Sequence, residues 1–289
     1  LLPPERVDLA VEKNILDLKS GEYATKINGL PSEDFPVIPK IDKKDSFKLQ
    51  AKDFKQALNQ VIFSVSLNDA RPEISGVYFA VENNQLVLAG TDSFRLAEKK
   101  VKIQLASAAD QAAPANNNEL KSFKPVIAPL RTIKEVLRII FEEDEQIEIF
   151  TNDNQILFDL PDRELISRLI EGEYPDYKQI IPTAFKTKAE IDKRDFLSAI
   201  KIAGLFAQKD VNTVVLDLQP QAGKILIESA SSAVGEEKTL IAAKIEGEPQ
   251  KIVFDYRYLL DGLNNLPSEE VIFEFVSPSA PALMRPKLA

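Results

Sequence analysis

Carboxylate side chains are the residues of this sequence from which a catalytic site could be built. The 289-residue chain contains no Cys and no His. This composition excludes disulfides, thiol catalysis, thiolate or His zinc sites and a Ser-His-Asp triad. Asp92, Asp162 and Asp176 are candidates for a paired-carboxylate site with a divalent metal. Because Asp and Glu together number 45, chance pairs are expected, and this enzyme hypothesis ranks low.

Basic side chains at helical spacing indicate a different chemistry, the attraction of phosphates. Arg131, Lys134 and Arg138 are spaced i, i+3 and i+7, which places them on one helical face. The net charge is −9, so any contact with nucleic acid must come from such a local basic face. One basic helix is most often an ordinary solvated face, but the coincidence on three helices favours phosphate binding. The full candidate set is Lys52, Lys55, Arg131, Lys134, Arg138, Lys193, Arg194, Lys201, Lys209 and Arg257.

The composition indicates a soluble globular protein with packed cores. Hydrophobic residues make up 44% of the chain and charged residues 28%, and the length suits two or three domains. No apolar run has the length of a membrane-spanning helix, and no secretory signal is visible at the start.

An internal repeat of about 140 residues predicts the elements that position these side chains. Residues 52–58 (KDFKQAL) resemble residues 194–200 (RDFLSAI), and each segment predicts an amphipathic helix. Residues 129–137 and 255–263 predict a second helix in each copy. Strand pairs follow each helix, with turns expected at Asn83 and Asn84 and again near Gly223.

The repeating unit is therefore helix, strands, helix, strands, an α+β fold with helices over largely antiparallel sheets. We expect the tail of one unit at residues 1–44, beginning with a hairpin, one complete unit at 45–184 and most of another at 185–289. Polar stretches predict linkers near both boundaries. Residues 106–120 (ASAADQAAPANNNEL) predict a mobile surface loop.

Four motifs along the chain are specific enough to compare with known families. They are residues 71–77 (RPEISGV), 90–97 (GTDSFRLA), 167–177 (SRLIEGEYPDY) and 279–286 (SAPALMRP). In this order they resemble the signatures of the bacterial β sliding clamps, the DNA polymerase III β subunits. The resemblance spans nearly the whole chain, but the front half of the first clamp domain and the last strand of the third have no match. It therefore predicts a chain truncated at both ends.

The resemblance implies the DNA clamp fold, with antiparallel sheets outside and paired helices inside. In this family two subunits close head to tail into a ring around duplex DNA, without regard to its sequence. The ring is a processivity factor in DNA replication: a non-catalytic accessory subunit of the DNA polymerase III holoenzyme, without a cofactor or metal, in the bacterial cytoplasm at the nucleoid. The basic helices would then line the pore and attract phosphates without fixing the DNA.

The resemblance also implies a pocket that binds the replicative polymerase, the clamp loader and repair proteins through short Gln-x-x-Leu-Phe motifs. Matched motif by motif, it comprises Ile74, Thr91, Phe94, Arg95, Leu96, Pro175, Gln179, Ile180, Pro281 and Met284. Ser93 and Phe94 stand where the family commonly has Gly and His, and Gln179 stands where a basic residue is frequent. Because a flexible peptide loses entropy on binding, a modest affinity is expected for one motif.

A subunit interface is the third implication. Leu205 and Phe206 match the family's apolar plug, and Tyr23, Thr25 and Ile27 match the partner surface. Apolar residues at a helix end more often belong to a core than to a subunit interface. A peptide-binding scaffold that does not encircle DNA stays open as an alternative, beside the metal-dependent enzyme.

Overall fold

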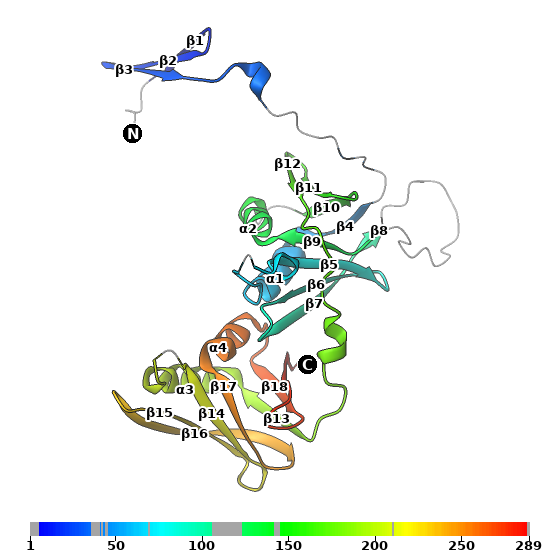
Figure 1. The fold of residues 1–289 in the computed structure, drawn as a ribbon, viewed down its shortest axis with the longest axis vertical. Helices are drawn as coiled ribbons and strands as arrows, with labels where there is room; N and C mark the ends of the chain where they lie inside the picture. Colours follow the sequence, from blue (N-terminus) through cyan, green and yellow to red (C-terminus); the bar gives the residue numbers. More distant parts are fainter. Residues whose placement is uncertain are drawn as a thin grey trace. The chain divides into compact units, whose positions relative to one another are not determined.

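The computed structural model describes residues 6–35, 41, 43, 46–68, 70–105, 123–141, 145–209 and 211–287. The chain divides into two compact units, Leu1–Asp42 and Lys43–Ala289, which are described separately (Figure 1). The predicted loop at residues 106–120 lies outside the described residues, as does most of the linker expected before residue 46. Within the described residues, no helix has the length and apolar character needed to cross a membrane.

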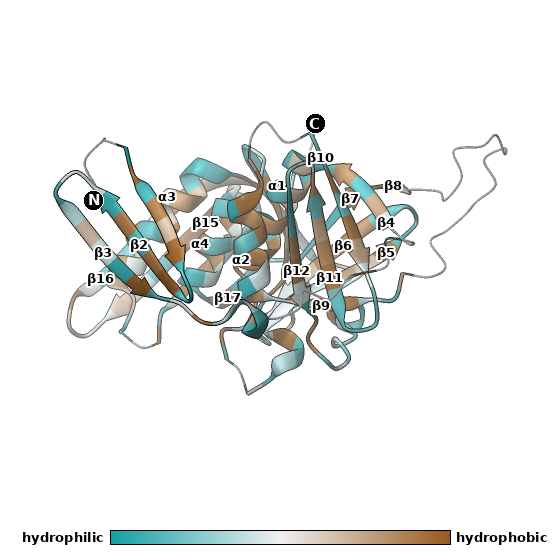
Figure 2. Cartoon of the chain, turned by 90° about the horizontal axis from the view of Figure 1, so that it is seen from above, coloured by the Kyte–Doolittle hydropathy of each residue, from teal (hydrophilic) through white to brown (hydrophobic). Residues whose placement is uncertain are grey.

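The first unit is a three-stranded antiparallel sheet in the order β1–β2–β3. Its elements are β1 (Asp8–Glu12), β2 (Ile15–Ser20), β3 (Tyr23–Asn28) and the 3-10 helix η1 (Ser32–Asp34). The pairing of β1 with β2 confirms the predicted hairpin. Leu9 lies opposite Leu18, and Leu16 lies between Val11 and Ile27, so one face of the sheet is apolar. Figure 2 shows hydrophobic and hydrophilic segments along its strands.

The second unit contains two copies of one α+β fold, as the repeat predicts. In the first copy a strand leads into each helix, and antiparallel strands follow it. Its elements are β4 (Ser46–Gln50), α1 (Ala51–Ile62), η2 (Pro72–Ile74), β5 (Gly76–Glu82), β6 (Gln85–Thr91), β7 (Leu96–Lys102), β8 (Gln104–Leu105), β9 (Val126–Pro129), α2 (Leu130–Ile139), β10 (Gln146–Thr151), β11 (Gln155–Leu160) and β12 (Arg163–Arg168).

The second copy follows the 3-10 helix η3 (Tyr177–Ile180) and repeats this order. Its elements are β13 (Thr187–Asp192), α3 (Lys193–Phe206), β14 (Thr213–Gln219), η4 (Pro220–Ala222), β15 (Lys224–Ser231), β16 (Gly235–Gly247), β17 (Gln250–Asp255), α4 (Tyr256–Asn265), β18 (Glu270–Phe275) and β19 (Leu283–Pro286). Both predicted turns are confirmed. Asn83 and Asn84 adopt φ of 49° and 58°, and Gly223 adopts 61°, the left-handed region that these residue types tolerate.

The sheets of the two copies differ in one segment. The first copy has separate sheets in the orders β7–β6–β5–β9 and β12–β11–β10–β4–β8, whereas the second has one sheet in the order β17–β14–β15–β16–β13–β18–β19. The long strand β16 joins that sheet because residues 235–242 pair with β15 and residues 243–247 pair with β13. In the first copy two separate strands form the corresponding pairings: β7 pairs with β6, and β8 pairs with β4.

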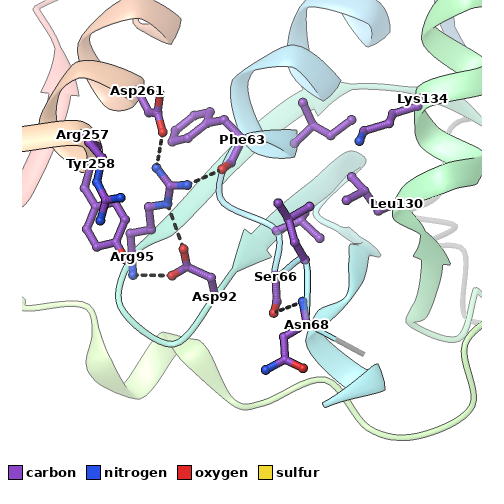
Figure 3. Close-up of a pocket in the computed structure, with 13 residues that line it drawn as sticks. Phe63, Ser66, Asn68, Asp92, Arg95, Leu130, Lys134, Arg257, Tyr258 and Asp261 are labelled. Carbon is purple, nitrogen blue, oxygen red and sulfur yellow. Dashed lines mark hydrogen bonds and ion pairs between the residues drawn. The ribbon is translucent and has the colours of Figure 1, made fainter. Parts of the chain in front are cut away.

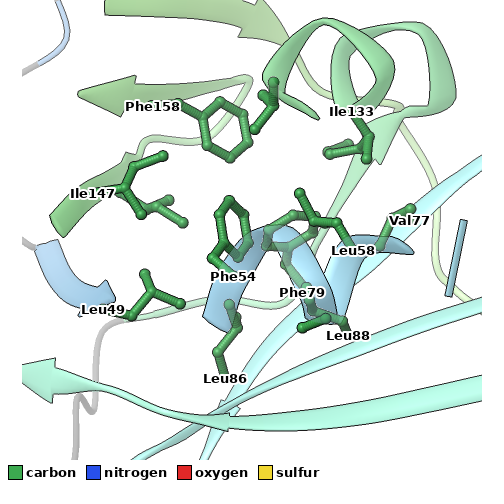
Figure 4. Close-up of a cluster of buried hydrophobic side chains, with 14 of the residues drawn as sticks. Leu49, Phe54, Leu58, Val77, Phe79, Leu86, Leu88, Ile133, Ile147 and Phe158 are labelled. Carbon is green, nitrogen blue, oxygen red and sulfur yellow. The ribbon is translucent and has the colours of Figure 1, made fainter. Parts of the chain in front are cut away.

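Each copy has its own core, built on a phenylalanine that the repeat aligns. Phe54 and Phe196 are both fully buried. Phe54 stacks on Phe158 with ring centroids 6.1 Å apart and meets Phe79 edge-on at 6.2 Å (Figure 4). In the second copy Phe196 lies 6.2 Å from Phe273. The helices therefore cover the sheets with the apolar faces that their periodicity predicts.

Candidate functional site

The predicted DNA-facing side chains lie on all four α-helices, except Lys209, which follows the end of α3. Most of them are exposed to solvent: Lys52, Arg131, Lys134, Arg138, Arg194, Lys201, Lys209 and Arg257. Arg138 forms an ion pair with Glu135 one turn earlier, at 2.7 Å. Because this pair is exposed, it contributes little to stability and leaves the guanidinium accessible.

Lys55 and Lys193 have structural partners in addition to their predicted role. Lys55 Nζ donates to the carbonyl of Ile140, just after α2, at 2.7 Å. Lys193 Nζ donates to the carbonyl of Leu266, just after α4, at 2.8 Å. In each copy a lysine of the first helix thus satisfies a carbonyl at the end of the second, where a positive charge also complements the helix dipole.

Arg257 is held by Asp255, the N-cap residue of its own helix. Its Nη2 donates to Asp255 Oδ2 at 2.6 Å, and its Nε donates to Asp255 Oδ1 at 3.0 Å. This carboxylate raises the pKa of Arg257 above its ordinary value. The side chain is 54% exposed, so its remaining N–H groups stay open to a ligand.

A cleft of about 1040 Å³ lies between the two copies, at the ends of α1, α2 and α4 (Figure 3). Lys134 and Arg257 lie along its lining, so two predicted DNA-facing residues from different copies share one cavity. Its other walls combine apolar and polar side chains. The remaining lining residues are Ile62, Phe63, Val65, Ser66, Leu67, Asn68, Asp92, Arg95, Leu130, Tyr258 and Asp261.

The turn between β6 and β7 carries several predicted pocket residues. Asp92 Oδ1 accepts the backbone N–H groups of Phe94 and Arg95, each at 3.0 Å. Thr91 Oγ1 donates to the carbonyl of Arg95 at 2.7 Å. Ser93 takes a φ of 80°, and Phe94 is 82% exposed. Local hydrogen bonds therefore fix a turn that presents an aromatic ring to solvent.

Arg95 is the most heavily bonded side chain of this turn. Its Nε donates to Asp92 Oδ2 at 3.0 Å, and its Nη2 donates to the carbonyl of Phe63 at 2.7 Å. Its Nη1 donates to Asp261 of α4, and the guanidinium lies over the ring of Tyr258 at 4.6 Å. Phe63, Tyr258 and Asp261 were not predicted as site residues, because no spacing along the chain connects them with residue 95.

The other predicted pocket residues lie in both copies. The backbone N–H of Ser66 donates to the carbonyls of both Ile74 and Thr91, and Thr91 pairs with Leu96 across the β6–β7 ladder. The predicted pocket residues Ile74, Thr91 and Leu96 therefore lie together in the first copy. Met284 lies opposite Phe273 in the second copy and packs on its core. The remaining members are Pro175, half-buried, and Gln179, Ile180 and Pro281, exposed.

A tyrosine cluster anchors the segment that carries Pro175 and Ile180. Tyr174 stacks on Tyr78 of β5 with centroids 4.8 Å apart. Tyr177 meets Tyr78 edge-on and donates its hydroxyl to Glu98 Oε2 at 2.6 Å. Burial, as the largest cause, raises the pKa of both Tyr174 and Tyr177. The connection between the two copies is thus packed onto the first copy's sheet.

The predicted interface residues are largely exposed. Leu205 near the end of α3 is 73% exposed, Tyr23 is 60% exposed and Ile27 is 49% exposed. Thr25 is also exposed, whereas Phe206 is half-buried. Tyr23, Thr25 and Ile27 alternate along β3, so they share the apolar face of its sheet.

The three candidate carboxylates are each held by a neighbour in sequence. Asp92 binds Arg95, Asp162 Oδ1 accepts from Arg163 at 2.6 Å, and Asp176 Oδ2 accepts from Gln179 at 2.7 Å. Within the described residues, no three carboxylates are grouped as a metal ion would need. These contacts are local ion pairs and turn-stabilising bonds.

Two protein-family models match adjacent parts of the chain. Residues 48–176 match the central domain of the DNA polymerase III beta subunit. Residues 178–289 match the C-terminal domain of the same subunit.

Curated proteins and solved structures agree with these matches. The chain is 31% identical over 288 residues to a beta sliding clamp of Staphylococcus aureus, covering 99% of this chain and 72% of the relative. The DNA polymerase sliding clamp of Bacillus subtilis superposes with a TM-score of 0.88 at 30% identity, covering 100% of this chain and 73% of that one. The DNA polymerase III beta chain of Streptococcus pneumoniae gives 0.85 at 30% identity, covering 99% and 72%.

Proposed function

The chain belongs to the family of DNA polymerase III beta subunits, the beta sliding clamps, and we propose that it encircles duplex DNA and tethers a replicative polymerase. The observation that carries the proposal is the exposed basic set on the helices of an otherwise acidic chain. Lys134 and Arg257 bring this set onto one cleft from both copies. Sequence-independent attraction to phosphates needs only such charges, since closure of a ring supplies the retention.

A pair of charge-reversal variants tests the DNA-facing assignment. We expect Arg131→Glu with Lys134→Glu to weaken binding of linear duplex at low salt by about tenfold and to reduce the salt slope by about 2. Lys100→Glu with Lys102→Glu on β7 is the control, because it makes the same charge change on exposed strand positions. Equal losses in a fluorescence anisotropy titration would show that only net charge matters and would refute the assignment.

Encirclement is tested by the topology of the DNA. A clamp is retained on nicked circular DNA and released when the circle is linearised. Release at the same rate from both forms would favour a peptide-binding scaffold that does not surround DNA. The role is non-catalytic and needs no cofactor, and its place is the bacterial cytoplasm at the nucleoid.

We further propose a head-to-tail dimer in which β3 of one subunit adds to β16 of the other. Residues 235–242 of β16 pair only with β15, and β3 pairs only with β2, among the described residues. Unpaired strand edges can add a partner strand. Leu205 is exposed on α3, a helix in contact with both β15 and β16. Leu205→Lys should shift sedimentation toward the monomer, whereas Val253→Lys, at another exposed position, should not.

Partner docking is proposed for the pocket residues of the two copies. Phe94 and Ile180 are 82% and 58% exposed, so they offer apolar surface to the Leu-Phe end of a Gln-x-x-Leu-Phe motif of the polymerase, the clamp loader or repair proteins. Phe94→Ala should weaken binding of a labelled peptide by about tenfold. Val234→Ala, also at an exposed position, is the control. Unchanged affinity of Phe94→Ala would remove this ring from the pocket.

A further inference from the structure

The guanidinium of Arg95 joins three structural elements. Asp92 belongs to its own turn, Phe63 ends α1, and Asp261 belongs to α4 of the other copy. The side chain is only 20% exposed. Nε, Nη1 and Nη2 each have an acceptor, and an aromatic ring covers the guanidinium plane. A group held in this way has little capacity left to bind a peptide directly.

The contact with α4 has two parts that require a defined geometry. Asp261 receives an ion pair from Nη1, while Tyr258, one turn earlier on the same helix, places its ring 4.6 Å from the guanidinium carbon. Because a guanidinium is planar, an in-plane ion pair and a ring stacked on its face together restrict the orientation of the helix. The carbonyl of Asp261 also accepts from Asn265 Nδ2 at 2.9 Å.

The position of Arg95 connects this contact to the partner pocket. Arg95 immediately precedes Leu96, and its carbonyl accepts the hydroxyl of Thr91. Pro281 and Met284 belong to the copy that contains α4. A change in the orientation of α4 relative to the turn would therefore change the separation between the two groups of pocket residues.

We infer that Arg95 is a positioning residue, which couples the two copies through Asp261 and Tyr258 and holds the two walls of the partner pocket at their binding separation. The inference rests on the proposed docking function. It reassigns Arg95 from a wall of the pocket to the contact behind it, and it adds Asp261, which is 45% exposed, as a residue required for binding.

A double-mutant cycle on peptide affinity tests the coupling. Arg95→Ala and Asp261→Ala should each weaken binding of a labelled Gln-x-x-Leu-Phe peptide by about tenfold, or about 1.4 kcal/mol. The double variant should lose no more than Arg95→Ala alone, because Arg95→Ala already removes the contact with Asp261. Lys251→Ala is the control, since it removes an exposed cation that is paired within its own copy, with Glu228. Wild-type affinity of Asp261→Ala would overturn the inference.

A distance measurement reads the same contact without a peptide. The chain has no Cys, so spin labels at Asn154→Cys and Gln221→Cys, both exposed positions, report on the two copies specifically. Arg95→Ala and Asp261→Ala should broaden the distance distribution, and Lys251→Ala should not. An unchanged distribution in Arg95→Ala would overturn the positioning role. Failure of the unsubstituted chain to bind peptide, with the broadening present, would instead overturn the docking function alone.

Discussion

The two copies of the fold bury equivalent residues, but different side chains donate to the buried carbonyl at the end of their first helix. In the first copy the hydroxyl of Ser64 donates to the carbonyls of Val61 and Gly90. In the second copy the hydroxyl of Ser229 donates to the carbonyl of Ala203 at 2.7 Å. The aligned helices α1 and α3 match Val61 with Ala203, and Gly90 and Ser229 are each the sixth residue of the strands β6 and β15. One buried carbonyl at the helix end is thus satisfied from the loop in one copy and from the strand in the other.

This difference explains why Gly90 has no side chain. A Cβ there would lie 2.7 Å from the carbonyl of Val61 and 2.8 Å from Ser64 Oγ. The space that Ser229 fills in the second copy is already occupied by Ser64 in the first. Satisfying the buried polar group is the shared requirement, and the residue that does so is free to vary.

The helix starts also differ between the copies. Asp192 accepts the N–H of Asp195 at 2.9 Å and caps α3, and Asp255 accepts the N–H of Arg257 at 2.9 Å and caps α4. The helices α1 and α2 begin after Gln50 and Pro129 without a side-chain cap. The second copy therefore uses local capping where the first depends more on packing.

The largest expected effect tests the equivalence of the two cores. Phe54→Ala and Phe196→Ala should each lower the free energy of unfolding of their own copy by about 4 kcal/mol, because each removes a fully buried ring and leaves a cavity. Chemical denaturation followed by circular dichroism measures the loss. A cost below about 1 kcal/mol at one position would show that the copies do not share a core design.

The Ser64 and Gly90 arrangement gives the next effect. Gly90→Ala should cost about 2 kcal/mol of unfolding free energy, because its Cβ meets backbone and a buried hydroxyl. Gly90→Ser combined with Ser64→Ala transplants the second copy's solution and should recover part of that loss. Gly262→Ala is the control, since open space surrounds that position on α4, and it should stabilise by up to about 1 kcal/mol. A transplant less stable than Gly90→Ala would contradict the comparison.

The capping difference predicts a smaller effect with opposite signs in the two copies. Asp192→Ala should destabilise the second copy by about 1 kcal/mol, because the N–H of Asp195 loses its acceptor. Gln50→Asp, which supplies the first copy with such an acceptor, should stabilise by about 0.5 kcal/mol. Thermal unfolding midpoints measure both. If neither substitution changed the unfolding midpoint, packing alone would determine both helix starts.

A charge cluster on the second copy's sheet gives the smallest effect and depends on pH. Hydrogen bonds from Lys287 and Lys188 lower the pKa of Glu190 from its ordinary value of 4.5 to about 2. A lowered folded-state pKa stabilises the fold above pH 4.5, and this stabilisation is lost as the pH falls to about 2. Glu190→Gln should therefore cost about 1 kcal/mol or less at pH 7 and progressively less below pH 4.5. A cost independent of pH, measured by urea denaturation, would exclude the charge as its origin.

Much of the fold was predictable because it depends on periodic burial. The pattern around Phe54 and Phe196 predicted helices with apolar faces, and both residues are fully buried. The turn at Asn83 and Asn84 was predictable because few residue types adopt left-handed backbone conformations. The joining of the second copy's strands into one sheet was not predictable, since it depends on how β16 pairs on its two halves.

The functional residues also divide into those that a local sequence pattern predicts and those that depend on tertiary packing. The sequence by itself determined the repeat, the family and the basic helix positions, because each depends on residue types at fixed spacings along one element. Only the tertiary structure decided that Lys55 and Lys193 bind helix ends and that Arg95 meets Asp261, 166 residues later. Contacts of this kind depend on the packing of separate elements, and the sequence between them carries no spacing that records it.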